Sequence, residues 1–344
     1  MRIELHQDPS VFDLLAPEWD SLLTSATTNV VFLTREWQST WWRHMQPGDL
    51  LVITARDEVD RLLAIVPLFR HKTDEGKLSL SIVGCEDVSD YLDFIVLPDQ
   101  EDAVCREVLR FMTSAEFPTW DKLSFCNAPS NSVVNRAFYA AAEAAALPVR
   151  RCQQDVCPVV DLPRTWDDYL ATLDKKQRHE VRRKIRRAEA EAKTAWYVVD
   201  PNQQDLSVEM ESFFELHRLS SPDKNIFMDD RMRAFFSDVA RNLASRGWLH
   251  LSFITMNGQR AAGMLCFEYN NAFEVYNSGY DPNSYAHLSP GIVLLSYCIQ
   301  QAIGRGRTVF DFLRGDEEYK FRFGAKPTGV YEIALTRDGS GRTP

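Results

Sequence analysis

The stretch WLHLSFITMNGQRAAGMLCFEYNNAFEVYNSGYD, residues 248–281, decides the fold of this chain. Its apolar runs are separated by two dipeptides that favour tight turns, Asn257-Gly258 and Asn270-Asn271, so it predicts three strands joined as consecutive hairpins. Hairpin strands pair antiparallel, whereas a doubly wound sheet needs helical crossovers between parallel strands. The stretch therefore favours a mixed α/β (α+β) sheet over a single large doubly wound one.

The elements around this stretch follow one order in both halves of the chain. In the first half, helices are predicted at residues 8–26 and 34–45, and a hairpin at 50–69. Strands at 78–84 and 91–97, a helix at 101–115, a strand at 120–128 and a last helix at 133–147 follow. In the second half, strands are predicted at residues 156–162, 195–199, 248–281 (three strands), 308–313 and 329–336. Helices are predicted there at residues 165–173, 289–304 and 316–323. Since 344 residues suffice for two domains, we expect two copies of one unit, at 1–154 and 155–337, and a frayed tail at 338–344.

Composition and charge exclude several classes of protein. Lys and Arg total 39 against 49 Asp and Glu, and a net charge of −10 argues against general nucleic-acid affinity. The acidic N-terminal stretch lacks the apolar run of a signal peptide, and no apolar run reaches the ~18 residues of a membrane span. We therefore expect a cytoplasmic protein without a membrane span or a metal site. We also expect reduced, buried thiols at Cys85, Cys105, Cys126, Cys152, Cys157, Cys266 and Cys298, because no CxxC pair occurs.

The segment after the hairpins, residues 280–306, favours an anion site. Ser289 suits the N-cap of a helix, Pro290 suits its first position, and Gly291 leaves no side chain over the helix mouth. Free backbone N–H groups and the helix dipole attract anions there. The alternative is that these residues only start a helix well. At the equivalent point of the first half, acids crowd the helix start and glycine is absent, so only the second half is expected to bind a nucleotide-like cofactor.

The stretch TVFDFLRGDEEYKFRFGAKP, residues 308–327, carries candidate catalytic groups. Alternation places Asp311 on the face opposite Phe310 and Phe312. An acid in such a strand is costly to bury unless it is paired or near water, so Asp311 is either a site residue or a structural hydrogen-bond acceptor. Tyr319 follows the strand end, where a phenol can protonate a leaving thiolate of comparable pKa. The alternative for Tyr319 is packing at a rim.

Three stretches, SPGIVLL (289–295), FDFLRGDEEYKFRFGA (310–325) and SDYLDFIV (89–96), carry a resemblance to a known family. The chain resembles the GNAT-type acyltransferases of the CelD/FemAB-like group, which have tandem GNAT-like domains and are often described as cellulose or exopolysaccharide biosynthesis acetyltransferases. The family's Q/R-x-x-G-x-G/A loop appears here as HLSPGI, with Gly291 kept and Ser289 where the first glycine would fall.

The resemblance implies direct transfer of an acyl group from acyl-CoA, such as acetyl-CoA, to an amine or hydroxyl of a small-molecule or saccharide acceptor. It implies Tyr319 as the general acid. The candidate bases are Asp311 and Glu274, and a backbone N–H near Asn277–Ser278 is a candidate oxyanion donor. The residues expected to hold the donor are Ser289, Pro290, Gly291, Ile292 and Lys320, and those expected to bind the acceptor are Asp93 and Tyr280.

The segment KKQRHEVRRKIRR, residues 175–187, has eight Lys or Arg and one Glu. An apolar stripe at Val181 and Ile185 predicts a helix with its charges outward. The charges are either a solvated face or a site for an anionic partner: the 3′-phosphate of CoA, a nucleotide- or lipid-linked sugar, a tRNA acceptor stem or an anionic membrane. Because FemAB-like relatives use aminoacyl-tRNA, such a transferase is one alternative function. Another is a non-catalytic scaffold of a polysaccharide biosynthesis operon.

Overall fold

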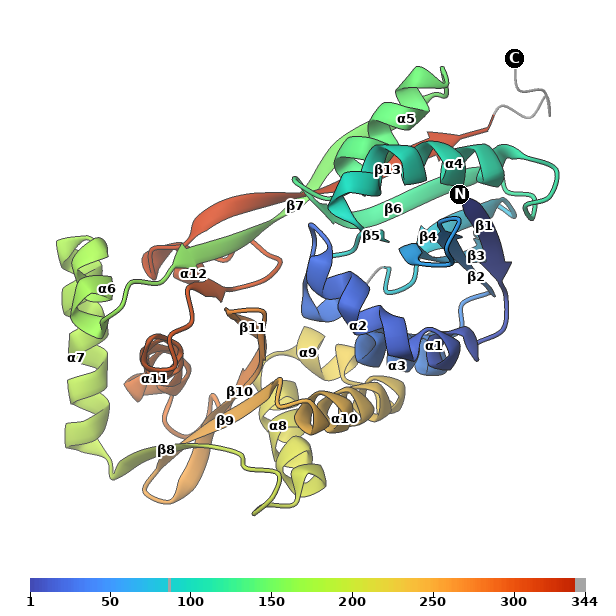
Figure 1. The fold of residues 1–344 in the computed structure, drawn as a ribbon. Helices are drawn as coiled ribbons and strands as arrows, with labels where there is room; N and C mark the ends of the chain where they lie inside the picture. The colour runs from blue at the N-terminus through green and yellow to red at the C-terminus, as the bar shows by residue number, and fades with distance from the viewer. Residues whose placement is uncertain (86–87, 338–344) are drawn as a thin grey trace. The chain divides into compact units, whose positions relative to one another are not determined.

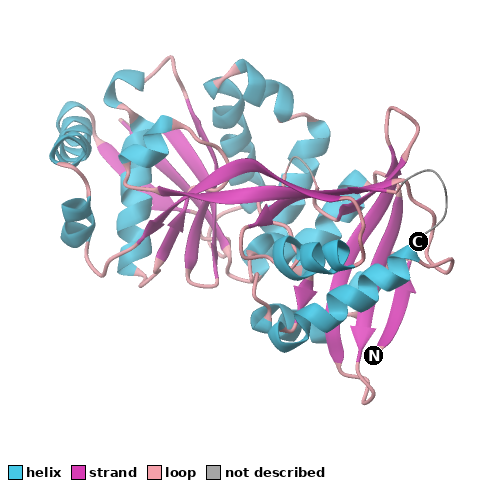
Figure 2. Cartoon of the chain, turned by 90° about the horizontal axis from the view of Figure 1, so that it is seen from above, coloured by secondary structure: helices cyan, strands magenta, loops and turns pink. Residues whose placement is uncertain are grey.

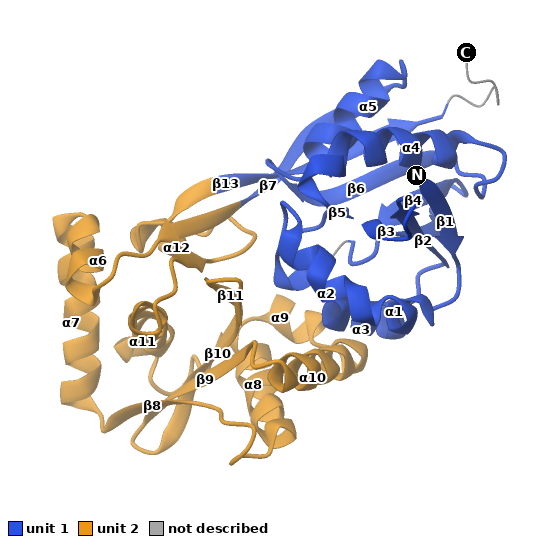
Figure 3. Ribbon diagram, viewed as in Figure 1, with its two compact units in different colours: residues 1–156, 328–344 blue, residues 157–327 orange. Residues whose placement is uncertain are grey.

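The computed structural model describes residues 1–85 and 88–337 and has two compact units (Figure 3). Unit 1 comprises residues 1–156 and 328–344, and unit 2 comprises residues 157–327. Strands β7 (Val149–Asp161) and β13 (Lys326–Thr336) each have residues in both units. The tail expected to fray, 338–344, lies outside the described residues.

Unit 1 has a mixed sheet in the order β1-β2-β3-β4-β6-β13, with β5 paired to β3. Its strands pair antiparallel except for β4 and β6, which are parallel. The strands are β1 (Arg2–His6), β2 (Asp49–Arg56), β3 (Leu62–Lys72), β4 (Leu78–Ile82), β5 (Ile95–Val96) and β6 (Lys122–Pro129). The helices are α1 (Val11–Leu14), α2 (Ala16–Ser25), α3 (Arg35–Met45), α4 (Glu101–Thr113) and α5 (Tyr139–Ala144), the last preceded by a π-helical turn at Val134–Phe138.

Unit 2 has its strands in the order β7-β12-β11-β10-β9-β8. The strands are β8 (Thr194–Val198), β9 (Leu249–Met256), β10 (Gln259–Tyr269), β11 (Ala272–Tyr280) and β12 (Val309–Asp311). The helices are α6 (Trp166–Thr172), α7 (Lys175–Glu191), α8 (Leu206–Ser220), α9 (Pro222–Phe227), α10 (Asp230–Ser245), α11 (Pro290–Gly304) and α12 (Glu318–Arg322). Figure 2 colours the strands of both units magenta and the helices cyan. The predicted mixed α/β fold is confirmed.

The two predicted hairpins of unit 2 are present. Both turns have positive φ at both central residues, 53° and 83° at Asn257-Gly258 and 43° and 63° at Asn270-Asn271. This is the geometry of the turns that match the twist of antiparallel strands, and asparagine and glycine adopt it at low cost. Where β10 pairs with β11, the register slips by one residue, so Tyr276 forms a bulge between Cys266↔Val275 and Leu265↔Asn277.

The sheet of unit 2 has helices on both faces. In Figure 1, α7 and α11 lie on one side of β8–β11, and α8, α9 and α10 lie on the other. Side-chain alternation along β11 agrees, because Val275 is buried in the core cluster that includes Leu295 of α11, whereas the next side chain, Tyr276, contacts Phe236 of α10. Consecutive residues of β11 therefore face different sets of helices.

A buried ion cluster anchors the end of α11 to β10. Glu268, 5% exposed, accepts a hydrogen bond from His250 Nδ1 (3.0 Å) and pairs with Arg305, and its second oxygen accepts from Arg307 Nε (3.0 Å). Burial alone would raise the pKa of Glu268, but the hydrogen bonds and charges of these three partners outweigh it and lower that pKa to about 2. The carboxylate is therefore ionised wherever the protein is folded at ordinary pH.

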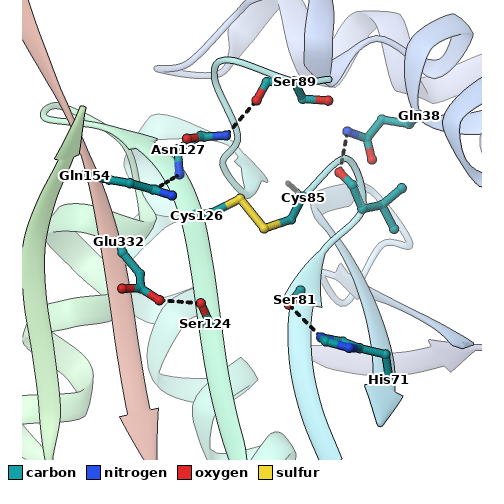
Figure 4. The surroundings of a disulfide bond; sticks show 11 residues. Gln38, His71, Ser81, Cys85, Ser89, Ser124, Cys126, Asn127, Gln154 and Glu332 are labelled. Atoms are coloured by element: carbon teal, nitrogen blue, oxygen red, sulfur yellow. Dashed lines mark hydrogen bonds between the residues drawn. A yellow bond between two sulfur atoms is a disulfide. The ribbon is translucent and has the colours of Figure 1, made fainter. Parts of the chain in front are cut away.

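A disulfide joins Cys85 to Cys126 in unit 1, so the expectation of reduced thiols is wrong at these two positions (Figure 4). Cys85 lies in the turn after β4, and Cys126 lies in β6. Because β4 and β6 pair in parallel, the two Cα atoms come within 6.1 Å, a separation that a disulfide spans. The free cysteines are Cys105, Cys157, Cys266 and Cys298, which are buried as expected, and Cys152, which is exposed, so the expectation of a buried thiol is wrong there.

Neither a membrane span nor a metal cluster occurs in residues 1–85 and 88–337. None of their helices combines the length and apolar character needed to cross a bilayer. None of their His, Cys, Asp and Glu side chains gather in a group of three or more that could hold a metal ion.

Candidate functional site

The N-terminus of α11 is open, as the sequence predicts, but Ser289 does not cap it with its side chain. Ser289 has a left-handed backbone (φ 54°), and its Oγ accepts a hydrogen bond from Lys184 Nζ of α7 at 2.9 Å. Its carbonyl accepts the N–H groups of Ile292 and Val293. A Cβ built on Gly291 would meet nothing within 4 Å. Backbone amide and helix dipole therefore face open space at Gly291.

A cavity of about 350 Å³ opens at this helix mouth. Apolar side chains such as Met264, Val275 and Leu295 form much of its wall, and Ser278 contributes from β11. The cavity brings together six of the residues predicted from the sequence: Tyr280, Ser289, Pro290, Gly291, Ile292 and Tyr319. A larger cavity, about 680 Å³, lies where α8 meets α9 and is lined by none of the predicted residues.

Tyr319, the predicted acid, comes from α12 and is mostly buried, with its ring edge against Phe312. Burial raises the pKa of the Tyr319 phenol above its usual value, and the nearby carboxylate of Glu317 raises it further. The phenol is therefore protonated at neutral pH. A protonated phenol in the wall of a cavity has a proton to give to a leaving group.

The two candidate bases are neighbours, but they do not line this cavity. Glu274 and Asp311 are register partners on the parallel strands β11 and β12, and both are buried. Phe310 and Phe312 belong to the core cluster beneath α11, so alternation turns Asp311 toward the opposite face, as the sequence predicts. Asp311 Oδ1 also accepts the backbone N–H of Leu313 at 2.7 Å. A catalytic role for either acid stays a prediction, and it requires an acceptor that approaches from that opposite face.

Lys320, expected to hold the donor, has a different set of contacts. It is 3% exposed, and its ammonium donates to the carbonyls of Leu313 (3.2 Å), Arg314 (2.8 Å) and Gly315 (3.1 Å). It also pairs with Glu317 Oε2 at 2.8 Å. An ammonium has three protons, so these acceptors use its donor capacity. In this structure Lys320 holds the loop after β12 rather than facing the cavity.

Asp93, expected to bind the acceptor, lies in unit 1 and is fully buried. Its oxygens accept hydrogen bonds from Thr28 Oγ1 (2.6 Å) and from the backbone N–H groups of Val133, Val134 and Phe94 (2.8, 2.9 and 2.9 Å). Burial raises the pKa of Asp93 to about 6, although these hydrogen bonds oppose the rise. The contacts give the carboxylate a structural role, and its predicted part in acceptor binding has no support from them.

The basic segment forms α7, with Val181 buried and Ile185 packed against the core cluster. Half of its eight cations have acidic partners: Arg182 with Asp167, Arg183 and Lys184 with Glu180, and Arg187 with Glu191. The others make no ion pair with the described residues: Lys175, Lys176, Arg178 and Arg186. The charged face is therefore half neutralised within the chain.

Three residues that contact Ser289 or strand β11 were not singled out from the sequence. Lys184 contacts Ser289, Lys224 Nζ of α9 donates to the Ser278 carbonyl, and His217 of α8 contacts Asn277 at 2.9 Å. Each comes from a helix distant in sequence from the segment that it contacts, so no local pattern marks it.

A family model and several solved structures match this chain. Residues 175–321 match the model of the acetyltransferase (GNAT) domain. No curated protein is significantly similar in sequence. The solved structure of FemX matches with a TM-score of 0.69 and 11% identity over 98% of both chains. The structure of a conserved protein of unknown function from Bacteroides thetaiotaomicron matches with a TM-score of 0.61 and 13% identity over 93% of this chain and 97% of its own.

The structure of L-PGS from Bacillus licheniformis matches with a TM-score of 0.57 and 13% identity over 94% of this chain and 92% of its own. At these identities the likeness concerns the fold. The N-terminus of α11, the cavity and Tyr319 all fall within the matched segment. Residues 175–321 of this chain thus match the GNAT acetyltransferase domain and have its fold.

Proposed function

We propose that unit 2 catalyses direct transfer of an acyl group from an acyl-CoA thioester to an amine or hydroxyl of a small-molecule or saccharide acceptor. One observation carries the proposal: the uncovered helix mouth at Gly291 and the protonated phenol of Tyr319 line a single cavity. The match of residues 175–321 to the GNAT domain supports the same reaction class.

In this proposal different residues of the chain bind the donor, shield the acyl group from water and transfer protons. The α11 N-terminus and the Lys184 ammonium beside it attract the diphosphate of the donor. The apolar wall around Met264 and Leu295 holds the acyl group away from water. Tyr319 gives its proton to the leaving thiolate, and the acceptor loses a proton to a base, for which Glu274 and Asp311 are the candidates. Holding donor and acceptor together contributes several kcal/mol by removing translational freedom.

A thiol-release assay tests the reaction. The protein is incubated with acetyl-CoA and with longer acyl-CoAs, each with a panel of amines and sugars, and free thiol is measured. Thermal shift with the same thioesters measures binding separately, since a ligand at 100 times its Kd stabilises by ~2.7 kcal/mol. Thiol release that depends on an acceptor supports the proposal. Absence of both release and thermal shift with every thioester contradicts it and favours a non-catalytic scaffold.

Aminoacyl-tRNA is a second candidate donor, favoured by the four cations of α7 that make no ion pair with the described residues and by the likeness in fold to FemX. A tRNA bound to α7 would lose affinity steeply with salt, because bound cations release counterions from the phosphates. Charge reversal at Lys175, Arg178 and Arg186, three of these four cations, should then abolish retention on charged tRNA. Retention that is unaffected by the reversal, or by salt, would exclude this donor.

A further inference from the structure

Strands β11 and β12 separate soon after they meet. They pair in parallel from Ala272↔Val309 to Glu274↔Asp311, whereas β11 continues along β10 to Tyr280. After Asp311 the chain stays with β7, because Phe312 N–H donates to Pro158 O at 3.0 Å. Beyond Glu274, this edge of β11 therefore has no strand partner among the described residues. Ser278, which lines the cavity, lies on that unpaired stretch.

The backbone N–H of Ser278 at this edge already has an acceptor. Ser278 N–H donates to Asn277 Oδ1 at 3.1 Å. The N–H and C=O of a strand residue point the same way, and successive residues point to opposite edges. Since the Ser278 carbonyl points outward to Lys224, the N–H of Asn277 points toward β10. The oxyanion donor expected among the backbone N–H groups near Asn277–Ser278 is therefore engaged, and another donor is needed there.

Lys224 supplies a donor at the same edge. Its ammonium is mostly buried and donates to the Ser278 carbonyl, which is its one hydrogen-bond acceptor among residues 1–85 and 88–337. Two of its three protons thus have no protein acceptor. Burial lowers the pKa of Lys224, while the charge of Glu317 opposes that change. Glu317 itself is held by Lys320 at 2.8 Å.

His217 fixes the strand beside Lys224. It is 1% exposed, and burial together with the Lys224 charge lowers its pKa to about 4, so the ring is neutral. Because an amide oxygen only accepts, the ring proton lies on Nε2 and donates to Asn277 Oδ1. A Cβ on Gly279 would lie 2.3 Å from the His217 backbone N, so only glycine lets the strand approach α8 this closely. The Ser278 carbonyl, and with it Lys224, is held in place.

We propose that Lys224 Nζ binds the oxyanion that forms during acyl transfer. The inference rests on the proposed function and adds a catalytic group to it. The acceptor nitrogen or oxygen gives up a proton to the base, Glu274 or Asp311, and attacks the acyl carbon. A C–N or C–O bond forms, while the carbonyl electron pair moves to oxygen. Lys224 keeps its protons and donates hydrogen bonds to that oxyanion. When the carbonyl re-forms, the C–S bond breaks and the leaving sulfur takes the Tyr319 proton.

The test compares Lys224→Met and Lys224→Arg with wild type and with Lys193→Met, which removes an exposed cation elsewhere in unit 2. Steady-state kinetics with the thioester that wild type uses give kcat and KM, and thermal shift gives the Kd of that thioester. We expect Lys224→Met to lower kcat about 100- to 1,000-fold, as loss of one oxyanion donor does, and to leave the Kd within a few-fold. Lys224→Arg should retain most of the activity, and Lys193→Met all of it.

Circular dichroism and the melting temperature show whether Lys224→Met is folded. If it is not, the kcat of Lys224→Arg, which retains the positive charge, tests the role of Lys224. A folded Lys224→Met with the kcat of wild type, or an arginine variant as impaired as the methionine one, overturns the role of Lys224 and leaves the proposed function standing. Absence of any acyl transfer by wild type overturns both.

Discussion

Substituting Gly291 should separate the stability of α11 from its capacity to bind a ligand. Gly291 and Gly304 are the second and last residues of this helix, neither has positive φ, and a Cβ at either would meet nothing within 4 Å. Alanine at either position restricts the unfolded chain and should stabilise the protein by about 0.4–1 kcal/mol. In a unit of this size that is a rise in melting temperature of about 1–4 °C.

The two substitutions should differ in binding, because Gly291 lines the cavity and Gly304 does not. A methyl group at Gly291 stands over the free amide of the helix mouth and should weaken acyl-CoA binding about tenfold, or ~1.4 kcal/mol. At a concentration 100 times the wild-type Kd, the stabilisation by ligand would then fall from ~2.7 to ~1.4 kcal/mol. The assay is thermal unfolding of wild type, Gly291→Ala and Gly304→Ala, with and without acetyl-CoA. Equal stabilisation of both variants by the ligand would refute the assignment of the helix mouth as the anion site.

Three further predictions concern the catalytic acid, the ion cluster and the disulfide. Tyr319→Phe keeps the buried ring and removes the proton donor, so kcat should fall about 100-fold or more with little change in melting temperature; an unchanged kcat would exclude Tyr319 as the acid. The pKa of Glu268 is about 2 in the folded chain against an ordinary 4.5. The depressed pKa contributes about 3 kcal/mol above pH 4.5 that is lost as pH falls toward 2. The free energy of unfolding of wild type, measured with denaturant, should therefore fall more steeply between pH 4.5 and 2 than that of Glu268→Gln. Parallel dependences of the two free energies on pH would contradict this. Cys85→Ser opens a link across 41 residues and should lower the free energy of unfolding by about 4 kcal/mol. A mass identical with and without reductant would show that the thiols are free.

The features that could be predicted from the sequence are those set by neighbouring residues. The turns at Asn257-Gly258 and Asn270-Asn271 follow from the tolerance of these residues for positive φ, and the hairpins follow from the turns. The open start of α11 follows from Pro290 and Gly291, whose backbone properties need no tertiary partner. The opposite facing of Asp311 and Phe312 follows from strand alternation.

The features that could not be predicted depend on contacts between distant segments. Ser289 has the residue type of a cap, but Lys184 from another helix takes its hydroxyl. Lys224 and His217 reach β11 from α9 and α8, and nothing in their own surroundings marks them as contacts of this strand. The Cys85–Cys126 disulfide depends on the pairing of β4 with β6, which the spacing of the cysteines does not reveal.

The pairing of β6 with β13 has a consequence for how the chain acquires its fold. The register runs from Val330↔Pro129 to Thr336↔Lys122, and all of unit 2 lies between these paired segments in the sequence. A nascent chain that has emerged only as far as β12 therefore exposes the backbone hydrogen-bonding groups of β6 along an open edge, the kind of edge that recruits foreign strands. Unit 2 is complete before that edge is covered, so synthesis order makes unit 1 the later of the two to close.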